Sequence, residues 1–202
     1  MRPPWWALAS AVVAPVAMIG GWTLAAARQQ SFDPVAETIS ALAAAPSVDT
    51  WIMTTGLAVT GACHVVTSLG LRGLPAAGRA LLALGGVATA AVAALPVDLY
   101  PHAHGVAAGT GFAALALWPA ASAARRPASG RGIGVGPGLG TSAVLVVLLG
   151  AFVLELAQGG PGGGAALGLT ERLVAGAESL APLAVAVWLR ARSRQTSRTG
   201  PG

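Results

Sequence analysis

The sequence predicts an all-α fold, a polytopic membrane bundle of six transmembrane helices with a short amphipathic outer helix between the first two. Hydrophobic residues make up 54% of the 202 positions and charged residues only 9%, a composition outside the range of soluble domains. The apolar residues form six stretches, each close to the roughly 20 residues that a helix needs to cross a bilayer. We place these spans at about residues 6–26, 50–71, 79–96, 103–123, 139–158 and 170–189.

The positive charge of the chain does not indicate a nucleic-acid partner. The formal net charge is +5 and all twelve basic residues are arginine, but they lie in short gaps between apolar stretches rather than on a polar domain. The single cysteine, Cys63, lies inside an apolar stretch, so the sequence contains no disulfide framework. The expected partner is the lipid bilayer, with a lipid or small molecule as a possible ligand.

The distribution of arginine predicts the orientation of the bundle. If all six stretches span, only Arg28 and Arg172 lie on one side, and the other ten arginines share the opposite side. These ten are Arg2, Arg72, Arg79, Arg125, Arg126, Arg131, Arg190, Arg192, Arg194 and Arg198. The positive-inside rule then places both termini in the cytoplasm. We expect residues 1–190 to form one membrane domain and residues 191–202 to be a disordered basic tail.

The segment between the first two spans has a helical polar pattern. Asp33 followed by Pro34 is a favourable helix start. Its apolar side would consist of Val35, Ile39 and Leu42, and its polar side of Asp33, Glu37 and Ser40. The pattern predicts a helix over Ser31–Ala45 that lies flat on the outer interface.

Polar residues inside the spans are few and recur at helical spacing. Thr60, His64, Thr67 and Ser68 share one face of the second span, and we expect that face to point into the bundle because it would be unpaired in lipid. Glu178 lies on the sixth span. We expect it to face the interior and to approach His104 at the outer end of the fourth span.

Five stretches in sequence order carry a family resemblance: FDPVAETISALAA, WIMTTGLAVTGACHVVTSLGLR, RALLALGGVATAAVAALP, HGVAA and GLTERLVAGAESLAPLAV. With these the chain resembles the bacterial six-helix integral membrane family known as domain of unknown function 998, from about Trp5 to Arg190. The resemblance implies a multi-pass protein of the bacterial cytoplasmic (inner) membrane and transfers no activity. The positions it marks as typical, and our candidate ligand-binding residues, are Asp33, Glu37, Ser40, His64, His104, Glu171, Arg172 and Glu178.

Three interpretations of these polar residues stay open. The first is a non-catalytic bundle whose outer polar site binds a lipid headgroup, a small ligand or a membrane partner. The second is an outer-leaflet metal-dependent hydrolase, in which zinc would activate a water molecule; the weak ligand candidates are His64, Asp98, His102, His104 and Glu178. Ser40 with His104 and Glu37 is a conceivable nucleophile group without metal. The third is a small-solute or proton-coupled transporter with His64 and Glu178 as titrating groups.

Overall fold

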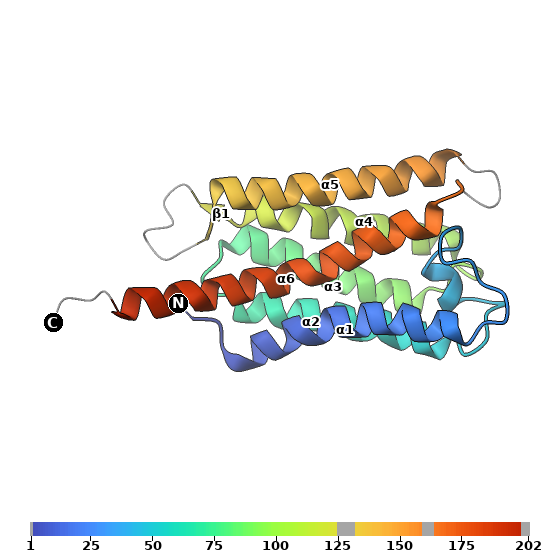
Figure 1. Ribbon diagram of the computed structural model, residues 1–202, viewed down its shortest axis with the longest axis horizontal. Coiled ribbons are helices and arrows are strands. Elements are labelled where there is room, and N and C mark those ends of the chain that lie inside the picture. Colours follow the sequence, from blue (N-terminus) through green and yellow to red (C-terminus); the bar gives the residue numbers. More distant parts are fainter. Residues whose placement is uncertain (1, 125–131, 159–163, 199–202) are drawn as a thin grey trace.

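The computed structural model describes residues 2–124, 132–158 and 164–198, and these form an all-α bundle (Figure 1). Its elements follow the apolar stretches of the sequence closely. They are α1 (Trp5–Ala27), the short 3₁₀ helix η1 (Ser40–Ala43), α2 (Trp51–Gly70), α3 (Ala76–Ala94), α4 (Pro101–Ala121), β1 (Ala123–Ala124), β2 (Ile133–Gly134), α5 (Val135–Gln158) and α6 (Leu167–Arg198). The two strands form one short parallel pair.

The six long helices run alternately up and down the bundle, and both termini lie at the same end (Figure 1). Each helix packs against the next one in sequence, and α6 closes the ring by packing against both α1 and α5. We call the end with the termini the terminal end. The opposite end, with the α1–α2, α3–α4 and α5–α6 connections, is the capped end. The described arginines follow this division as the sequence predicted, because Arg28 and Arg172 lie at the capped end and the others toward the terminal end.

Five of the described helices are long and apolar enough to cross a membrane, namely α1, α2, α3, α5 and α6. The protein is therefore a multi-pass membrane protein by the length and composition of its helices. Helix α4 has 21 residues, about 30 Å at 1.5 Å per residue, so its length suffices. Its first half contains Pro101, His102 and His104, which lower its hydropathy.

Helix α6 extends beyond the predicted sixth span. It continues to Arg198, through residues that the sequence suggested to be part of a disordered tail. The side chains around the expected boundary support helical structure, because the Arg192 guanidinium lies 4.7 Å from the centre of the Trp188 ring. Residues 199–202 of the expected tail, and the predicted cytoplasmic arginines Arg125, Arg126 and Arg131, lie outside the described residues.

The predicted amphipathic helix over Ser31–Ala45 is not formed, and this prediction was wrong in its extent. One helical turn follows Asp33, with the Glu37 N–H donating to the Asp33 carbonyl at 2.7 Å, and the four-residue η1 follows. Between them the backbone bonds to α6 instead of to itself. The Val35 carbonyl, which would accept from Ile39 in a helix, accepts from the Leu169 N–H at 2.9 Å. Tertiary hydrogen bonds thus replace the helical ladder.

We refer to residues 31–44 as the cap. Its apolar side chains are buried unequally: Ile39 and Leu42 are in the core, whereas Val35 is exposed. Ile39 and Leu42 join a hydrophobic cluster at the capped end that includes Met18, Met53 and Val92. A second cluster, around Leu82 and Trp118, fills the terminal end. The candidate site lies where these two clusters approach each other.

Candidate functional site

A cavity lies between the helices below the cap. The centre of a water molecule can occupy about 50 Å³ of it, several times the room that one water requires. The lining comes from α1, α2, α3, α4, α6 and the cap. The lining residues are Met18, Ile39, Ser40, Leu57, His64, Thr89, Val92, Ala108, Gly111, Phe112, Leu115, Glu171, Ala175, Glu178 and Ser179.

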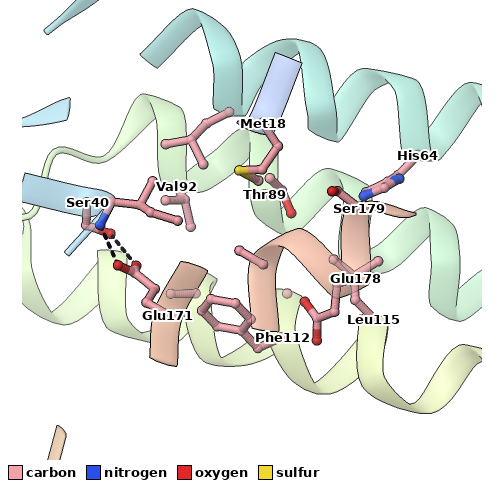
Figure 2. A pocket seen from close by; sticks show the side chains of 15 residues that line it. Met18, Ser40, His64, Thr89, Val92, Phe112, Leu115, Glu171, Glu178 and Ser179 are labelled. Atoms are coloured by element: carbon pink, nitrogen blue, oxygen red, sulfur yellow. Dashed lines mark hydrogen bonds between the residues drawn. The ribbon is translucent and has the colours of Figure 1, made fainter. Parts of the chain in front are cut away.

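Most of the lining is apolar, and its polar groups gather at two ends (Figure 2). Ser40 and Glu171 lie together at the end next to the cap, and His64, Glu178 and Ser179 lie toward the other end (Figure 2). We call these the cap-side end and the inner end. The two glutamates occupy one face of α6 seven residues apart, a rise of about 10 Å.

The carboxylate of Glu171 fastens the cap to α6. One oxygen, Oε2, accepts the Ile39 N–H at 2.5 Å, and the other, Oε1, lies 3.5 Å from the Ser40 hydroxyl. Glu171 is buried, with 5% of its surface exposed. A buried carboxylate requires such donors to offset its loss of hydration.

Arg172 holds the same segment from its outer side. Its Nη1 donates to the carbonyl oxygens of Pro34 at 2.9 Å and Glu37 at 2.7 Å, and also to Gly168 in its own helix. Its guanidinium lies 5.4 Å from the centre of the Phe32 ring, within range of a cation–π contact. Glu171 and Arg172, consecutive in sequence, therefore bind two successive parts of the cap.

Asp33 and Glu37 are exposed and shape the cap without reaching the cavity. The Asp33 carboxylate accepts the Val35 N–H at 2.8 Å, and the Glu37 carboxylate accepts the Asp33 N–H at 2.8 Å. These are local side chain–backbone bonds of the kind that terminate helices and form turns. Both residues belong to the structure of the cap.

His104 bonds to the cap and to the α3–α4 connection. Its Nδ1 lies 2.7 Å from the Leu95 carbonyl oxygen and its Nε2 lies 3.0 Å from the Ser40 hydroxyl. Because a carbonyl only accepts, Nδ1 carries a proton, and Nε2 of a neutral ring accepts from Ser40. Both ring nitrogens are thus occupied, so the predicted pairing of His104 with Glu178 was wrong.

The Ser40–His104 pair has the tautomer of a nucleophile and its base, but its surroundings do not suit acyl transfer. The preceding backbone donor, the Ile39 N–H, is bonded to Glu171. An oxyanion that develops on a substrate carbonyl attacked by Ser40 would lie near the Glu171 carboxylate, which repels it. Glu37, the third member of that hypothetical group, bonds to Asp33 instead. The pair anchors the cap to α4.

The five weak metal-ligand candidates are not brought together. Asp98 and His102 are exposed near the start of α4, His104 bonds to the cap, and only His64 and Glu178 line the cavity. No group of three His, Cys, Asp or Glu side chains that could hold a metal ion occurs among the residues that the structure describes. The donor set at the cavity therefore does not fit the tetrahedral zinc site of a hydrolase.

The polar face of α2 points into the bundle, as the sequence predicted. Thr60, His64, Thr67 and Ser68 are all at most 2% exposed. Two of them bind α1: the Thr60 hydroxyl is 3.2 Å from the Ala14 carbonyl, and the Thr67 hydroxyl is 2.8 Å from that of Ser10. His64 instead lines the cavity, beside the point where α2 and α3 touch. There a Cβ on Gly86 would lie 2.6 Å from the Gly61 carbonyl oxygen, so only glycine fits.

The inner end of the cavity contains polar atoms without partners. Glu178 and His64 are each 1% exposed. Glu178 Oε1 and His64 Nδ1 have no hydrogen-bond partner among the described residues. The interior orientation predicted for Glu178 is therefore correct, although it does not bond to His104. Unpartnered buried polar atoms are rare in folded proteins and require an explanation.

Sequence reasoning did not single out Thr89, Ser179 or Phe112 among the lining residues. Thr89 is the one hydroxyl residue of the apolar stretch 79–96, and Ser179 directly follows Glu178; both were visible signals. Phe112, whose ring lies along the cavity between the two glutamates (Figure 2), has no distinguishing pattern in the sequence. The Leu95 carbonyl that orients His104 has none either, because it is a backbone group.

A comparison with known families identifies the family of this chain. The model of the family described as protein of unknown function (DUF998) matches residues 12–188, which is most of the chain. The chain belongs to this family. No curated protein and no solved structure matches it. The resemblance read from the sequence is thus confirmed for DUF998, and the site residues stand on the geometry above.

Proposed function

We propose that this DUF998 protein is a non-catalytic membrane protein that binds a small amphipathic molecule in the cavity below its cap. The observation that supports this is the inner end of the cavity, where Glu178 and His64 are buried with polar atoms that no described residue pairs. An intramembrane ionisable residue is costly and by default indicates a functional site. A bound ligand that supplies hydrogen bonds would offset that cost.

Binding accounts for the structure better than passage of a solute through the bundle. A transporter would need a polar route from the inner end of the cavity to the terminal end. The space there is filled by the cluster around Leu82 and Trp118, both fully buried. Apolar side chains therefore separate the inner end of the cavity from the terminal end of the bundle, as expected for a binding pocket.

The cavity also has the general character of a small-molecule site. Such sites are concave, mostly apolar and contain a few placed polar groups. Here the apolar wall includes Met18, Leu57 and Phe112, and polar groups occur at both ends. The lining is drawn from five helices and the cap, so the pocket requires the complete bundle.

Cavity-filling variants test the proposal. The probe is radiolabelled 2-phenylethanol, measured by equilibrium binding to the protein in phosphatidylcholine nanodiscs, with the signal of empty discs subtracted. We expect saturable binding that Ala108→Phe abolishes, because Ala108 lines the cavity. Val106→Phe is the matched control, since Val106 is on the same helix but 71% exposed. Binding that does not saturate, or that Ala108→Phe leaves unchanged, would contradict the proposal.

We further propose that α4 crosses the bilayer with the other five helices and that both termini are cytoplasmic, in the cytoplasmic membrane of a bacterium. Its position in the ring, antiparallel to α3 and α5, supports the crossing (Figure 1). The gathering of arginine at the terminal end supports the orientation. The capped end and its cavity would then face the outside.

A topology reporter tests this orientation. A reporter enzyme that is active only in the cytoplasm is expected to work when fused after Arg194 and to be silent when fused after Ala165 in the α5–α6 connection. The physical reason is that arginine-rich connections are retained on the cytoplasmic side. The opposite pattern of activity would reverse the proposed orientation, and activity at both sites would contradict the crossing of α6.

A further inference from the structure

We propose that the ligand of this cavity carries a primary ammonium group, held at the inner end by Glu178, and a short apolar body that extends toward the cap. This inference rests on the proposed function and specifies the chemical class of the ligand. Three features of the lining support it: its charge, the direction of its hydrogen bonds, and the distribution of its apolar side chains.

The charge of the lining disfavours an anion. The ionisable residues among the fifteen lining positions are Glu171, Glu178 and His64, and none of these positions is an arginine or a lysine. Arg172 is directed away, to the cap carbonyls of Pro34 and Glu37. A carboxylate or phosphate ligand would therefore enter beside two glutamates without a permanent cation to pair with it.

The hydroxyl groups at the inner end present acceptors rather than donors. The Thr89 hydroxyl donates its proton to the Gly85 carbonyl at 2.8 Å, and the Ser179 hydroxyl donates to the Gly176 carbonyl at 2.8 Å. Each hydroxyl has a single proton, so only its oxygen lone pairs stay available to a ligand. With the unpartnered Glu178 Oε1, these oxygens form a set of acceptors that lacks a donor.

An ammonium group supplies what this set lacks. A primary ammonium has three N–H donors and a positive charge, and bonds from a charged donor to a carboxylate are among the strongest hydrogen bonds. His64 Nδ1, also unpartnered, is an acceptor when the neutral ring carries its proton on Nε2. An alcohol would provide one donor and no charge, and a quaternary ammonium would provide no donor.

The cap-side end is the poorer site for the charged group. Glu171 Oε2 already accepts the Ile39 N–H, whereas Glu178 Oε1 has no hydrogen-bond partner among the described residues. Between the two ends the wall is apolar, with Met18, Val92 and Phe112 along it (Figure 2). The two glutamates are separated by about 10 Å of helix rise, which limits the apolar body to a short chain or a single ring.

Matched probes test the ammonium group separately from the cavity. Binding of 2-phenylethylamine, 2-phenylethanol and phenylacetate is compared in phosphatidylcholine nanodiscs, a lipid that has no primary amine. We expect the amine to bind at least about tenfold more tightly than the alcohol, from the added charged hydrogen bond, and the acid to bind more weakly than the alcohol. Glu178→Gln is expected to abolish the preference for the amine while keeping binding of the alcohol, which shows that the variant is folded.

Asp98→Asn, which removes an exposed acid outside the cavity, is the matched control and is expected to keep the preference. His64→Gln, a second variant, is expected to reduce the preference by a smaller factor. Equal binding of amine and alcohol by the wild type, or a preference that survives Glu178→Gln, would overturn the ammonium assignment and leave the cavity proposal intact. Failure of both probes to bind saturably would overturn both.

The same ammonium chemistry has two sources, a free amine and the ethanolamine headgroup of a lipid. Replacing part of the phosphatidylcholine by phosphatidylethanolamine distinguishes them. If the lipid headgroup enters the cavity, the apparent affinity for 2-phenylethylamine falls in the mixed discs in wild type. An unchanged affinity assigns the site to free amines.

Discussion

Glu171 and Glu178 occupy one face of the same helix, and the protein treats them differently. Glu171 lies under the cap, where its Oε2 accepts the Ile39 N–H and its Oε1 lies 3.5 Å from the Ser40 hydroxyl. Glu178, two turns deeper, is more completely buried and has an oxygen that no described residue pairs. Both line the same cavity, at opposite ends (Figure 2). Glu171 thus contributes to the fold, whereas Glu178 keeps a carboxylate oxygen available for a hydrogen bond.

The two glutamates are distinguished by their hydrogen-bond partners rather than by residue type or burial. Removing one partner of a satisfied buried pair leaves the other without compensation, which costs more than the pair contributes. Removing a group that has no partner eliminates its desolvation cost instead. The two glutamates should therefore respond in opposite directions to the same substitution.

The largest expected effect is a loss of stability in the Glu171→Leu variant. This substitution leaves the Ile39 N–H unpaired in the interior and removes the bonds that fasten the cap, so we expect a loss of about 3 kcal/mol in the free energy of unfolding. Glu178→Leu is expected to leave stability unchanged or to raise it. Unfolding of both variants and the wild type in the same detergent, followed by circular dichroism, measures the difference.

Glu171→Gln serves as the control for this comparison. Its amide oxygen can still accept the Ile39 N–H but carries no charge, so its stability should lie between those of Glu171→Leu and the wild type. Equal destabilisation by Glu171→Leu and Glu178→Leu would mean that Glu178 is satisfied in the folded protein, and the contrast between the two acids would fail.

An intermediate effect is expected for Arg172→Leu, which removes the two cap carbonyl contacts and the contact with Phe32. We expect a loss of about 1–2 kcal/mol, since the guanidinium is partly exposed and solvent replaces some of its bonds. Hydrogen exchange of the amides of residues 35–41 should accelerate, because the cap then lacks the carbonyl contacts that Arg172 provides. Arg28→Leu, which removes only the exposed ion pair with Asp49, should leave exchange in the cap unchanged.

The sequence predicted the helices well because their signal is local. Apolar stretches of membrane length became α1 to α6 with ends within four residues of those predicted, except that α6 continues to Arg198, and the polar face of α2 is buried as its spacing indicated. The sequence pattern of the cap was also local, but the helix that it predicted over Ser31–Ala45 is not formed. A helix start at Asp33 is present, yet Ile39 donates to Glu171, a residue 132 positions away. Such a partner cannot be read from the spacing of the segment itself.

Half of the eight candidate ligand-binding residues line the cavity, and their arrangement there could not be predicted. Ser40, His64, Glu171 and Glu178 line the cavity, but sequence spacing does not show which of them have partners. His104 was expected beside Glu178 from its depth along α4. The Leu95 carbonyl and Ser40 take its two nitrogens, and a backbone carbonyl leaves no trace in the sequence. Sequence reasoning predicted that Glu178 faces the interior and could not predict its contacts.

The smallest expected effect tests the cap-side end itself. The Ser40 hydroxyl lies 3.0 Å from His104 Nε2 and 3.5 Å from Glu171 Oε1, so it joins the cap to α4 at a point next to α6. Ser40→Ala should cost about 1 kcal/mol, because Glu171 keeps its bond to Ile39 while His104 Nε2 loses its partner in a buried position. His104→Leu should cost more, since it also frees the Leu95 carbonyl.

The coupling free energy between Ser40→Ala and His104→Leu tests whether the hydrogen bond between these residues holds the cap. Because they remove the same hydrogen bond, the double variant should be more stable than the sum of the single losses predicts, by about 0.5–1 kcal/mol. Ser68→Ala provides the matched comparison, since its hydroxyl donates only to Val65 in its own helix, and it should add independently to His104→Leu. Additive losses for Ser40 and His104 would show that the cap is held by Glu171 and Arg172 alone, and that the bond to α4 contributes nothing to keeping the cavity closed from above.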